Sequence, residues 1–245
     1  MSWLGGERVE LDICDSTNDE ALALARRGAR HGTIVVARAQ RAGRGRDGRS
    51  WASPPGMGLY FSAVLRPQLA LAQVPPLTLA IGIAVVDAAR SCGAPAQLKW
   101  PNDVLVHARK LAGVLVEAHS QGGTLDAVIA GIGVNLTGDL PEEVARTAIT
   151  LDEGAGVATA HAGFEAALVA SLEQWIDRYV AGGTSTILGA WTDRMAPGLS
   201  ARATVEGAIA TGEMVGLADD GALLLRTADG RVHRVRSGDV ELIKR

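Results

Sequence analysis

The sequence predicts an α/β (α+β) protein in which helices pack on a mixed sheet and a small β-barrel follows. Strand-like and helix-like patterns alternate through residues 1–196, and residues 104–134 hold three strand-like runs joined by short turns, which is typical of an antiparallel meander. Two Asp-Gly pairs, at 220–221 and 229–230, predict hairpins of a small five-stranded barrel. Because Pro197-Gly198 separates the two patterns, we expect one domain over 1–196 and the barrel over 197–245.

The composition supports a packed protein. Apolar residues make up 47% of the 245 residues and charged residues 21%, so a core is easily built and disorder is not expected. The net charge of −3 argues against a protein whose whole surface binds nucleic acid.

The first elements are read from alternation and helix-start signals. Val9, Leu11 and Ile13 alternate with polar residues and predict a strand. Thr17 and Glu20 have the spacing of a capping box, so we expect a helix that begins there and ends near Gly28. Two further strands are expected at residues 33–40 and 58–66, on either side of a polar loop.

The later elements follow the same logic. The Pro75-Pro76 pair leads into a largely apolar helix over 77–91, whose apolar run is too short to span a bilayer. Apolar residues at helical spacing predict an amphipathic helix over 161–180 and a second one over 187–195. The remaining strands are expected at residues 96–100, 104–106, 111–118 and 125–134.

Residues 43–49 form a glycine–arginine loop with the sequence Gly-Arg-Gly-Arg-Asp-Gly-Arg. Glycine lets a backbone approach a ligand closely, and the guanidinium group is a planar fork suited to phosphate and carboxylate oxygens. The loop lacks the Gly-Lys-Ser/Thr ending of a Walker A motif and is not a Rossmann fingerprint. The remaining alternatives are an anion site, a solvated basic loop or a nucleic-acid-binding tail.

Two further segments carry polar groups at strand ends. Lys99 to Asp103 places a cation, an amide and a carboxylate within a turn, where the carboxylate is suited to Mg²⁺ and the amide to an adenine edge, or both simply satisfy the turn. Lys110 begins the next strand. Gly131 and Gly133 lie inside a strand, which indicates either a ligand close to the backbone or a β-bulge.

Taken together, these segments resemble the biotin protein ligases over nearly the whole chain. The resemblance rests on Ser16-Thr17-Asn18, Gln40, the run from Gly43 to Trp51, Lys99–Asp103, Arg109–Gly113 and Gly131–Asn135. It implies a fold like that of class II aminoacyl-tRNA synthetases, with a catalytic biotin- and ATP-binding domain and an SH3-like C-terminal barrel. It implies an ATP-dependent ligase that converts biotin to biotinyl-5′-AMP and transfers biotin to a lysine of a biotin carboxyl carrier domain.

The resemblance also assigns roles to single residues. Lys110, Arg46 and Asp103 are the implied catalytic residues, and Asp103 is also the implied Mg²⁺ ligand or the group that orients a basic residue. The implied biotin contacts are Ser16, Thr17, Asn18, Gln40, Arg44, Arg46, Lys110, Gly113 and Gly131. The implied nucleotide contacts are Arg44, Arg46, Arg49, Trp51, Asn102, Lys110 and Asn135.

Three features differ from the family pattern. Asp47 stands where some relatives carry another arginine, which lowers the local positive charge. No helix-turn-helix segment precedes the match, so we expect a monofunctional enzyme that does not bind DNA. Residues 137–160, where relatives cover the adenylate, contain no aromatic residue.

Two other functions remain possible for this sequence. A lipoate- or octanoate-transferring enzyme on the same fold would need a long apolar tunnel, and a nucleic-acid-binding module would need a basic, aromatic surface. Cys14 and Cys92 suggest buried thiols in a reducing cytoplasm, and no signal peptide or membrane segment is evident. The resemblance leaves open a monomer or a homodimer.

Overall fold

A computed structural model describes residues 2–195, 200–205, 208–236, 238 and 240–243. A mixed seven-stranded sheet forms the first domain, in the order β1-β2-β3-β7-β6-β5-β4. Only β1 and β2 pair in parallel, and the neighbouring pairs from β2 onward are antiparallel. The strands are β1 (Arg8–Leu11), β2 (Ile34–Ala37), β3 (Gly58–Leu65), β4 (Gln97–Lys99), β5 (Asp103–Val106), β6 (Arg109–Gln121) and β7 (Thr124–Asn135).

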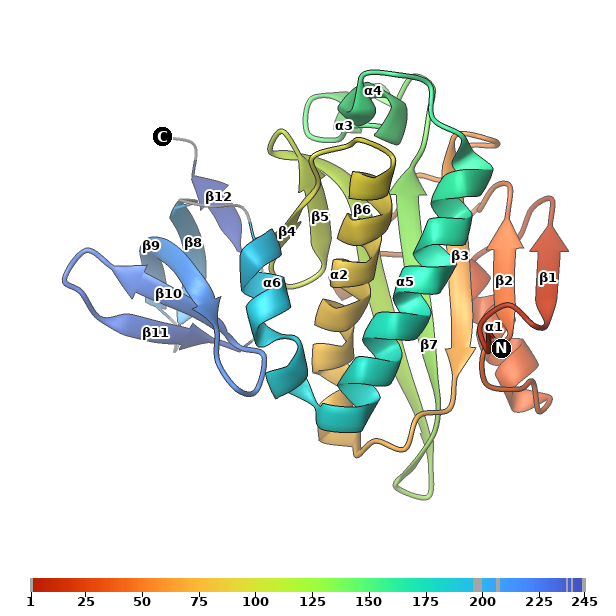
Figure 1. Cartoon of the computed structure of the whole chain (residues 1–245), viewed down its shortest axis with the longest axis horizontal. Coiled ribbons are helices and arrows are strands. Elements are labelled where there is room, and N and C mark those ends of the chain that lie inside the picture. Colours follow the sequence, from red (N-terminus) through yellow and green to blue (C-terminus); the bar gives the residue numbers. More distant parts are fainter. Residues whose placement is uncertain (1, 196–199, 206–207, 237, 239, 244–245) are drawn as a thin grey trace.

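Helices lie on both faces of this sheet, as Figure 1 shows. The long helices α2 (Val74–Ser91) and α5 (His161–Gly182) pack side by side on one face, and α1 (Thr17–Arg26) lies on the other, against β2, β3 and β7. The shorter helices α3 (Glu142–Ala145) and α4 (Leu151–Ala155) follow β7, and α6 (Leu188–Arg194) follows α5. The predicted meander of β5, β6 and β7 is confirmed.

The side-chain alternation of β3 shows how the two faces differ. Phe61, Ala63 and Leu65 join the main core under α2 and α5, whereas Val64 joins a smaller cluster under α1. Ser62 points to the second face and is fully buried there. A strand with alternating side chains therefore serves the core on one side and leaves polar groups on the other.

Helix α2 is longer than the sequence pattern suggested. With the short turn before it, the segment Leu71–Ser91 is long and apolar enough to cross a membrane by length and composition. In the fold, 61% of this window is buried, because α2 packs on the sheet and against the neighbouring helix α5. Its apolar surface is therefore accounted for by the core, as in a helix buried on several sides.

The predicted capping box at the start of α1 is wrong. Ser16, not Thr17, is the N-cap residue, and its side chain caps no backbone N–H. The Thr17 hydroxyl instead donates to Gln40 Oε1 at 3.1 Å, and the Ser62 hydroxyl lies 2.8 Å from it. Tertiary hydrogen bonds have taken the group that the local pattern assigned to the helix end.

The C-terminal domain is a five-stranded antiparallel sheet, in the order β11-β10-β9-β8-β12. It consists of β8 (Ser200–Val205), β9 (Ala208–Leu217), β10 (Leu223–Thr227), β11 (Val232–Val235) and β12 (Glu241–Ile243). Both Asp-Gly turns are confirmed, and β11 curls back to contact β8, which gives the barrel its shape. The proposed boundary at Pro197-Gly198 lies outside the described residues.

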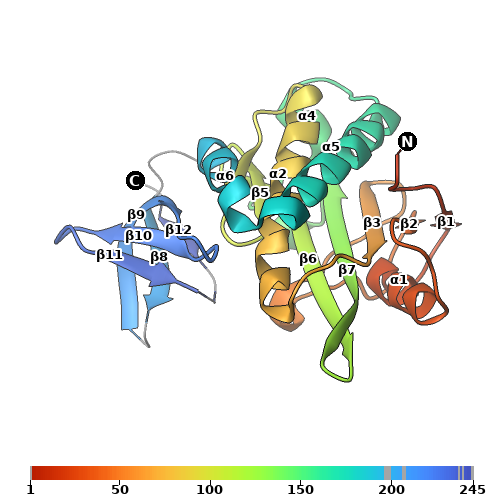
Figure 2. The same ribbon diagram turned by 60° about the horizontal axis from the view of Figure 1, so that its bottom comes forward.

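The C-terminal domain packs beside α6 and the β4 edge of the sheet (Figure 2). The Trp100 indole N–H donates to the carbonyl of Gly221 in the β9–β10 turn at 3.1 Å. A Cβ at residue 221 would lie 3.0 Å from Leu79 and 3.3 Å from Pro76, so the turn fits closely against the start of α2. The barrel therefore contacts the same segment, Lys99 to Asp103, that the sequence singled out.

Candidate active site

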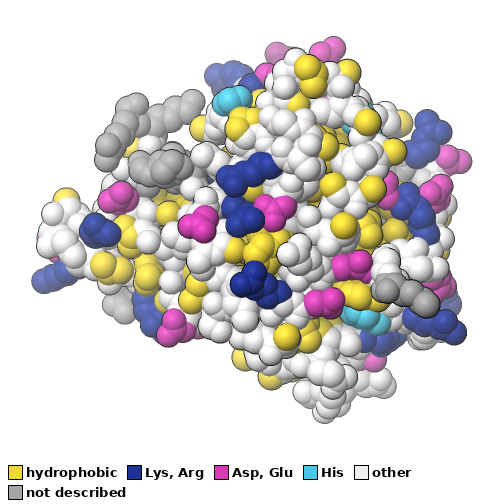
Figure 3. All heavy atoms as spheres, in the orientation of Figure 1, with side chains coloured by type: hydrophobic (Ala, Val, Ile, Leu, Met, Phe, Trp, Pro, Cys, Tyr) yellow, Lys and Arg dark blue, Asp and Glu magenta, His cyan; other side chains and the backbone are white. Residues whose placement is uncertain are grey.

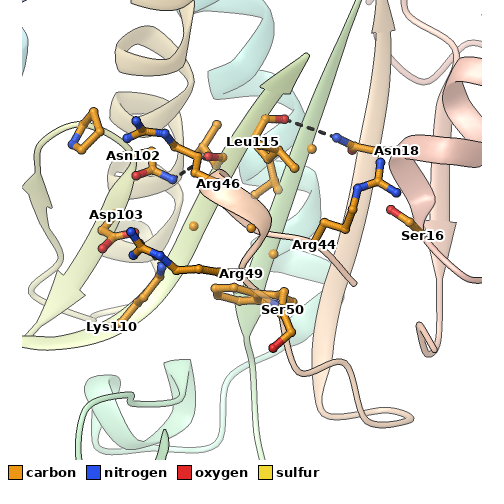
Figure 4. Close-up of a pocket in the computed structure, with 18 of the residues that line it drawn as sticks. Ser16, Asn18, Arg44, Arg46, Arg49, Ser50, Asn102, Asp103, Lys110 and Leu115 are labelled. Carbon is orange, nitrogen blue, oxygen red and sulfur yellow. Dashed lines mark hydrogen bonds and ion pairs between the residues drawn. The ribbon is translucent and has the colours of Figure 1, made fainter. Parts of the chain in front are cut away.

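All of the predicted site residues except Asn135 line one cavity of about 110 Å³ on the face of the sheet opposite α2 and α5. They come from the start of α1, the segment after β2 that holds Gln40, the glycine–arginine loop and Trp51 after it, the Lys99–Asp103 turn and the strands β6 and β7. Figure 4 shows how Ser16, Asn18, Arg44, Arg46, Asn102, Asp103 and Lys110 converge on the cavity. Residues far apart in the chain therefore meet where the sequence predicted one site.

A hydrogen-bonded polar cluster forms one end of the cavity. Gln40 Oε1 accepts from the backbone N–H and the hydroxyl of Thr17, at 2.8 and 3.1 Å, and Gln40 Nε2 donates to Ser53 Oγ at 2.8 Å. Asn18, which is 5% exposed, accepts from the Ser62 hydroxyl at 2.6 Å and donates to Glu117 at 2.6 Å. The cluster offers oriented donors and acceptors, which suit an amide-like ring better than an alkyl chain.

The glycines of β6 and β7 make room for protein side chains. A Cβ at Gly131 would lie 2.2 Å from Asn18 Oδ1, and one at Gly133 would lie 2.5 Å from Trp51 Cε2. Gly113, paired with Gly133 across the strands, also faces Trp51. No register shift occurs at these glycines, so the β-bulge alternative is wrong, and the close approach expected of a ligand is made here by Asn18 and Trp51.

The glycine–arginine loop is a closed hairpin. The Trp51 N–H donates to the Gly43 carbonyl at 2.8 Å, the Gly45 N–H donates to the Arg49 carbonyl at 2.7 Å, and Arg44 pairs with Ser50 as an antiparallel bridge. The tip is a single 3-10 turn, η1 (Arg46–Gly48). The hairpin carries its arginines over the cavity, where Figure 4 shows Arg49 pointing toward Asp103 and Lys110.

Asp47 occupies a position that most side chains avoid. Its backbone is left-handed, with φ 55° and ψ 36°, and its carboxylate lies 3.8 Å from Arg49. Aspartate and asparagine tolerate this conformation better than other residues with a Cβ. The turn geometry therefore gives a physical reason for an aspartate in a run that is otherwise basic.

Arg46 and Arg44 differ in what they bind. The Nη1 atom of Arg46 is buried without a hydrogen-bond partner among the described residues. Arg44 forms a two-pronged ion pair with Asp19, and this hydrogen bonding raises the pKa of Arg44 above its ordinary value. A buried guanidinium nitrogen without a partner is costly unless an anion reaches it, so Arg46 marks the anion site.

Two lysines share the carboxylate of Asp103. Lys110 Nζ lies 2.7 Å from Oδ1, and Lys99 Nζ lies 3.3 Å from Oδ2. Lys110 also lies 5.2 Å from the centre of the Trp51 ring, within range of a cation–π interaction. Arg44, Arg46, Arg49, Lys99 and Lys110 thus give the cavity five basic side chains against the single carboxylate of Asp103, a strongly anion-attracting lining.

This donor set does not fit a magnesium ion held by the protein alone. Both Asp103 oxygens already face ammonium groups, and the described residues contain no cluster of three or more His, Cys, Asp or Glu side chains that could hold a metal. Mg²⁺ usually keeps several waters and is bound through phosphates plus one or two carboxylates. The geometry favours the alternative role for Asp103, that of orienting Lys110.

The two asparagines predicted to read adenine are tied to the backbone. Asn102 Nδ2 donates to the Val114 carbonyl at 2.9 Å. Asn135 Nδ2 lies 3.2 Å from the Lys110 carbonyl and 3.3 Å from that of Ile149. Asn102 lines the first cavity, whereas Asn135 lines a neighbouring cavity of about 160 Å³.

The second cavity adjoins the first across three shared residues, Ser50, Trp51 and Lys110. Its other walls include Tyr60 from β3 and Pro141 and Val144 from the segment around α3. Pro141 and Val144 provide an apolar cover from residues 137–160, a segment that contains no aromatic residue. Two joined cavities with a lysine between them suit a reaction between two bound molecules.

Three residues of the site were missed by sequence reasoning. Ser62 is a lone hydroxyl in an apolar strand, a signal that was available in the sequence. Asp19 and Glu117 contact Arg44 and Asn18, but a carboxylate on a helix turn or on a half-exposed strand has no distinctive pattern. Only the tertiary fold brings them to the loop.

Comparisons with known proteins agree with this geometry. Residues 11–135 match the Biotin/lipoate A/B protein ligase family, and residues 202–243 match the Biotin protein ligase C terminal domain. A Biotin--[acetyl-CoA-carboxylase] ligase from Paracoccus denitrificans is 37% identical over 228 residues, which cover 89% of this chain and 93% of the relative. The chain belongs to the biotin protein ligase family.

Other relatives are similar to this ligase over almost its whole length. A bifunctional ligase/repressor, BirA of Bacillus subtilis strain 168, is 34% identical over 98% of this chain and 75% of its own length. The biotin protein ligase of Aquifex aeolicus, solved in complex with biotin and ATP, superposes with a TM-score of 0.83 at 30% identity, covering 98% of this chain and 100% of that chain. The predicted family and fold class of this ATP-dependent biotin ligase are confirmed.

Proposed function

We propose that this ligase activates biotin with ATP and transfers it to one lysine of a biotin carboxyl carrier domain. The observation that carries the proposal is the union, in one cavity, of the polar cluster around Gln40 with five basic side chains. A ureido ring and a triphosphate are the two chemistries that such a lining recognises. The acetyl-CoA carboxylase named for the Paracoccus relative is the natural acceptor class.

In the first step, the biotin carboxylate attacks the α-phosphorus of ATP and pyrophosphate leaves. Two anions must be brought together, so the site has to neutralise charge and fix orientation. Lys110 stands between the two cavities and is held by Asp103 at 2.7 Å, which suits it to the carboxylate and the α-phosphate. Arg46, with a buried nitrogen that lacks a partner among the described residues, supplies a second fixed cation.

In the second step, the amine of the acceptor lysine attacks the acyl carbon of the adenylate and AMP leaves. The mixed anhydride reacts with water, so the site must stay covered between the two steps. The closed hairpin that carries Arg44, Arg46, Arg49 and Trp51 is suited to this covering role. No covalent enzyme intermediate is required.

The two cavities divide the substrates. Biotin occupies the cavity of Ser16, Thr17, Asn18 and Gln40, and adenosine occupies the cavity that contains Asn135, with Trp51 between them. Asn102 acts by fixing the Val114 carbonyl. Mg²⁺, as part of the Mg-ATP substrate, would neutralise phosphate charge. Asp103 orients Lys110.

The setting of the reaction follows from its substrates. We infer a cytoplasmic location, which the need for ATP and an acceptor carboxylase supports, with biotin, ATP and a carrier domain as the partners and with neither DNA nor a membrane expected among them. Both described cysteines are free, and burial raises the pKa of the Cys14 thiol to about 11, which suits an unreactive thiol. Basic and acidic side chains are interspersed over the face that carries α2 and α5, unlike a nucleic-acid-binding face (Figure 3).

The deciding experiment is ATP-dependent transfer of biotin to a purified carrier domain, read by mass spectrometry. We expect the mass of one biotinyl group on one lysine, and omission of ATP should abolish it. Isothermal titration with biotin and with lipoate separates this function from that of a lipoate ligase. Tight binding of lipoate without binding of biotin would overturn the proposal.

A further inference from the structure

Two carboxylates outside the predicted site, those of Asp19 and Glu117, contact Arg44 of the glycine–arginine loop. We propose that Asp19 and Glu117 form a carboxylate latch on Arg44, which controls how long the loop stays over the bound adenylate. The effect on the adenylate rests on the proposed function. The closure of the loop by these two carboxylates is independent of the proposed function.

The contacts of Arg44 carry the first step. Its Nη1 lies 2.5 Å from Asp19 Oδ2 and its Nη2 lies 2.7 Å from Asp19 Oδ1, a bidentate pair. Its Nη2 is also 3.5 Å from Glu117 Oε2. Bidentate pairs between arginine and carboxylate fix orientation as well as distance, so the side chain of Arg44 is held in one place.

The latch joins three separate parts of the fold. Arg44 belongs to the loop, Asp19 to the first turn of α1, and Glu117 to β6. Because Arg44 is bridged to Ser50 across the hairpin, holding its side chain also holds the opposite arm of the loop. Figure 4 shows Arg44 directed to the side of the cavity where Ser16 and Asn18 lie, away from Asp103 and Lys110.

Glu117 also contacts Asn18, a residue of the polar cluster around Gln40. Its Oε2 accepts from Asn18 Nδ2 at 2.6 Å, and Asn18 lies over Gly131, where a Cβ would come within 2.2 Å of it. One carboxylate therefore positions both a residue that covers the cavity and a residue that lines it. While Glu117 Oε2 contacts both Asn18 and Arg44, a movement of the loop is coupled to a movement of Asn18.

The latch is suited to repeated opening. The side chains of Arg44, Asp19 and Glu117 are 38%, 50% and 33% exposed, so water screens their attraction. Ion pairs of this exposure are individually weak and weaken further with salt. The arrangement holds the loop closed without locking it, which a covered intermediate and a later acceptor both require. Asp19 and Glu117 are positioning residues, since they act through Arg44.

The test compares Asp19→Asn, Glu117→Gln and the double variant. Glutamine at 117 can still accept from Asn18, so Glu117→Gln removes the charge from the latch and keeps the hydrogen bond from Asn18. Asp12→Asn is the control, because Asp12 is 92% exposed and lies 4.0 Å from Arg38, away from the loop. Thermal unfolding of each variant should stay close to that of the wild type.

Hydrogen exchange in the ligand-free protein reads the latch directly. The amides of Gly45, Arg49 and Trp51 are hydrogen-bonded within the hairpin and report its opening. We expect exchange at these amides to rise roughly fivefold in Asp19→Asn and further in the double variant, as loss of an exposed pair predicts. Exchange within α2, on the other face of the sheet, and in Asp12→Asn should not change. Unchanged loop exchange in the double variant would overturn the proposal.

A second measurement follows the intermediate. After single-turnover formation of the adenylate from biotin and ATP, its release and the labelling of bystander lysines should rise in the double variant by a similar factor. Faster exchange with an unaltered release rate would overturn the role in retention. If the wild type forms no adenylate, the proposed function fails, and the exchange data still decide whether the latch exists.

Discussion

Trp51 lies on Gly133 so closely that a Cβ at residue 133 would stand 2.5 Å from Trp51 Cε2. The indole occupies the strip of sheet between the two cavities and lines both of them. Its Nε1 is buried without a hydrogen-bond partner among the described residues, so the ring is placed by packing on the glycines and by the loop backbone. Trp51 and the loop can therefore take this position only if residue 133 is a glycine.

Gly133→Ala should displace Trp51 and disturb the junction of the two cavities. We expect adenylate formation, measured as pyrophosphate release, to fall roughly tenfold or more, since small misplacements in a site have effects of this size. Gly163→Ala, in the first turn of α5, is the matched control, because the nearest side-chain atom that a Cβ there would meet is the Cβ of Ala160, at 3.8 Å. That variant should gain about 1 kcal/mol of helix stability and keep its rate. A wild-type rate in Gly133→Ala would contradict the role given to Trp51.

Lys110→Ala should reduce adenylate formation by orders of magnitude, because a fixed charge on a developing phosphate charge is worth about 3 kcal/mol. Lys99→Ala is the informative comparison, since both lysines pair with Asp103 and only Lys110 reaches both cavities. We expect the Lys99 variant to lose much less. Pyrophosphate release near the wild-type rate in Lys110→Ala would rule out the assignment.

Arg46→Gly should release the adenylate early. The variant loses the guanidinium whose Nη1 lacks a partner among the described residues and gains backbone freedom at the hairpin tip. Labelling of bystander lysines, followed by mass spectrometry, should increase. Arg41→Ala serves as the control, because Arg41 is 62% exposed and pairs with Asp15 outside the cavity. An unchanged dissociation rate of the adenylate in Arg46→Gly would exclude this role.

Asp47→Val should open the loop tip, because a β-branched residue in the left-handed conformation costs about 1 kcal/mol or more. Limited digestion with trypsin measures this, since Arg44, Arg46 and Arg49 are the cleavage sites within the hairpin. We expect roughly fivefold faster cleavage in Asp47→Val. Asp47→Asn, which suits the same backbone, should be cleaved as slowly as the wild type. Equal cleavage of all three proteins would remove the conformational explanation of Asp47.

Most helices and strands could be predicted from the sequence because its strongest signals are local. The alternation in β3, the apolar run of α2 and the Asp-Gly turns each depend on neighbouring residues. Beyond the meander, the order of the strands was not predicted, because no local pattern shows which distant strands pair. The gathering of Gln40, Lys110 and Gly131 in one site was expected from the resemblance alone.

The failures have a common physical cause, which is tertiary contact. The capping box at Thr17 was wrong because Gln40 and Ser62 compete for its hydroxyl. The β-bulge alternative at Gly131 and Gly133 was wrong because these glycines make room for Asn18 and Trp51, which come from other parts of the fold. Asp19 gave no signal because an exposed acid in a first helical turn is ordinary, and only the folded loop brings Arg44 to it.

Asp152 gives a prediction for stability at low pH. Burial raises the pKa of this carboxyl, but hydrogen bonds from the side chain and backbone of Thr159 and from Thr137 and His161 outweigh burial and lower it to about 2. Thr159 donates to Asp152 Oδ1 through its N–H at 2.8 Å and its hydroxyl at 2.6 Å, which fixes the segment between α4 and α5. The folded state therefore favours the ionised form.

A depressed pKa stabilises the fold above the unfolded value and loses that contribution as pH falls through the folded value. Since the Asp152 side chain is 22% exposed, the contribution at neutral pH is on the order of 1–2 kcal/mol. Urea unfolding of Asp152→Asn should show this deficit at pH 7, a shrinking deficit below about pH 4 and only a small fraction of it near pH 2. Glu143→Gln, at an exposed position on α3, should show no such trend. A deficit that persisted near pH 2 would mean that the Asp152 contacts act through shape, and not through the carboxylate charge.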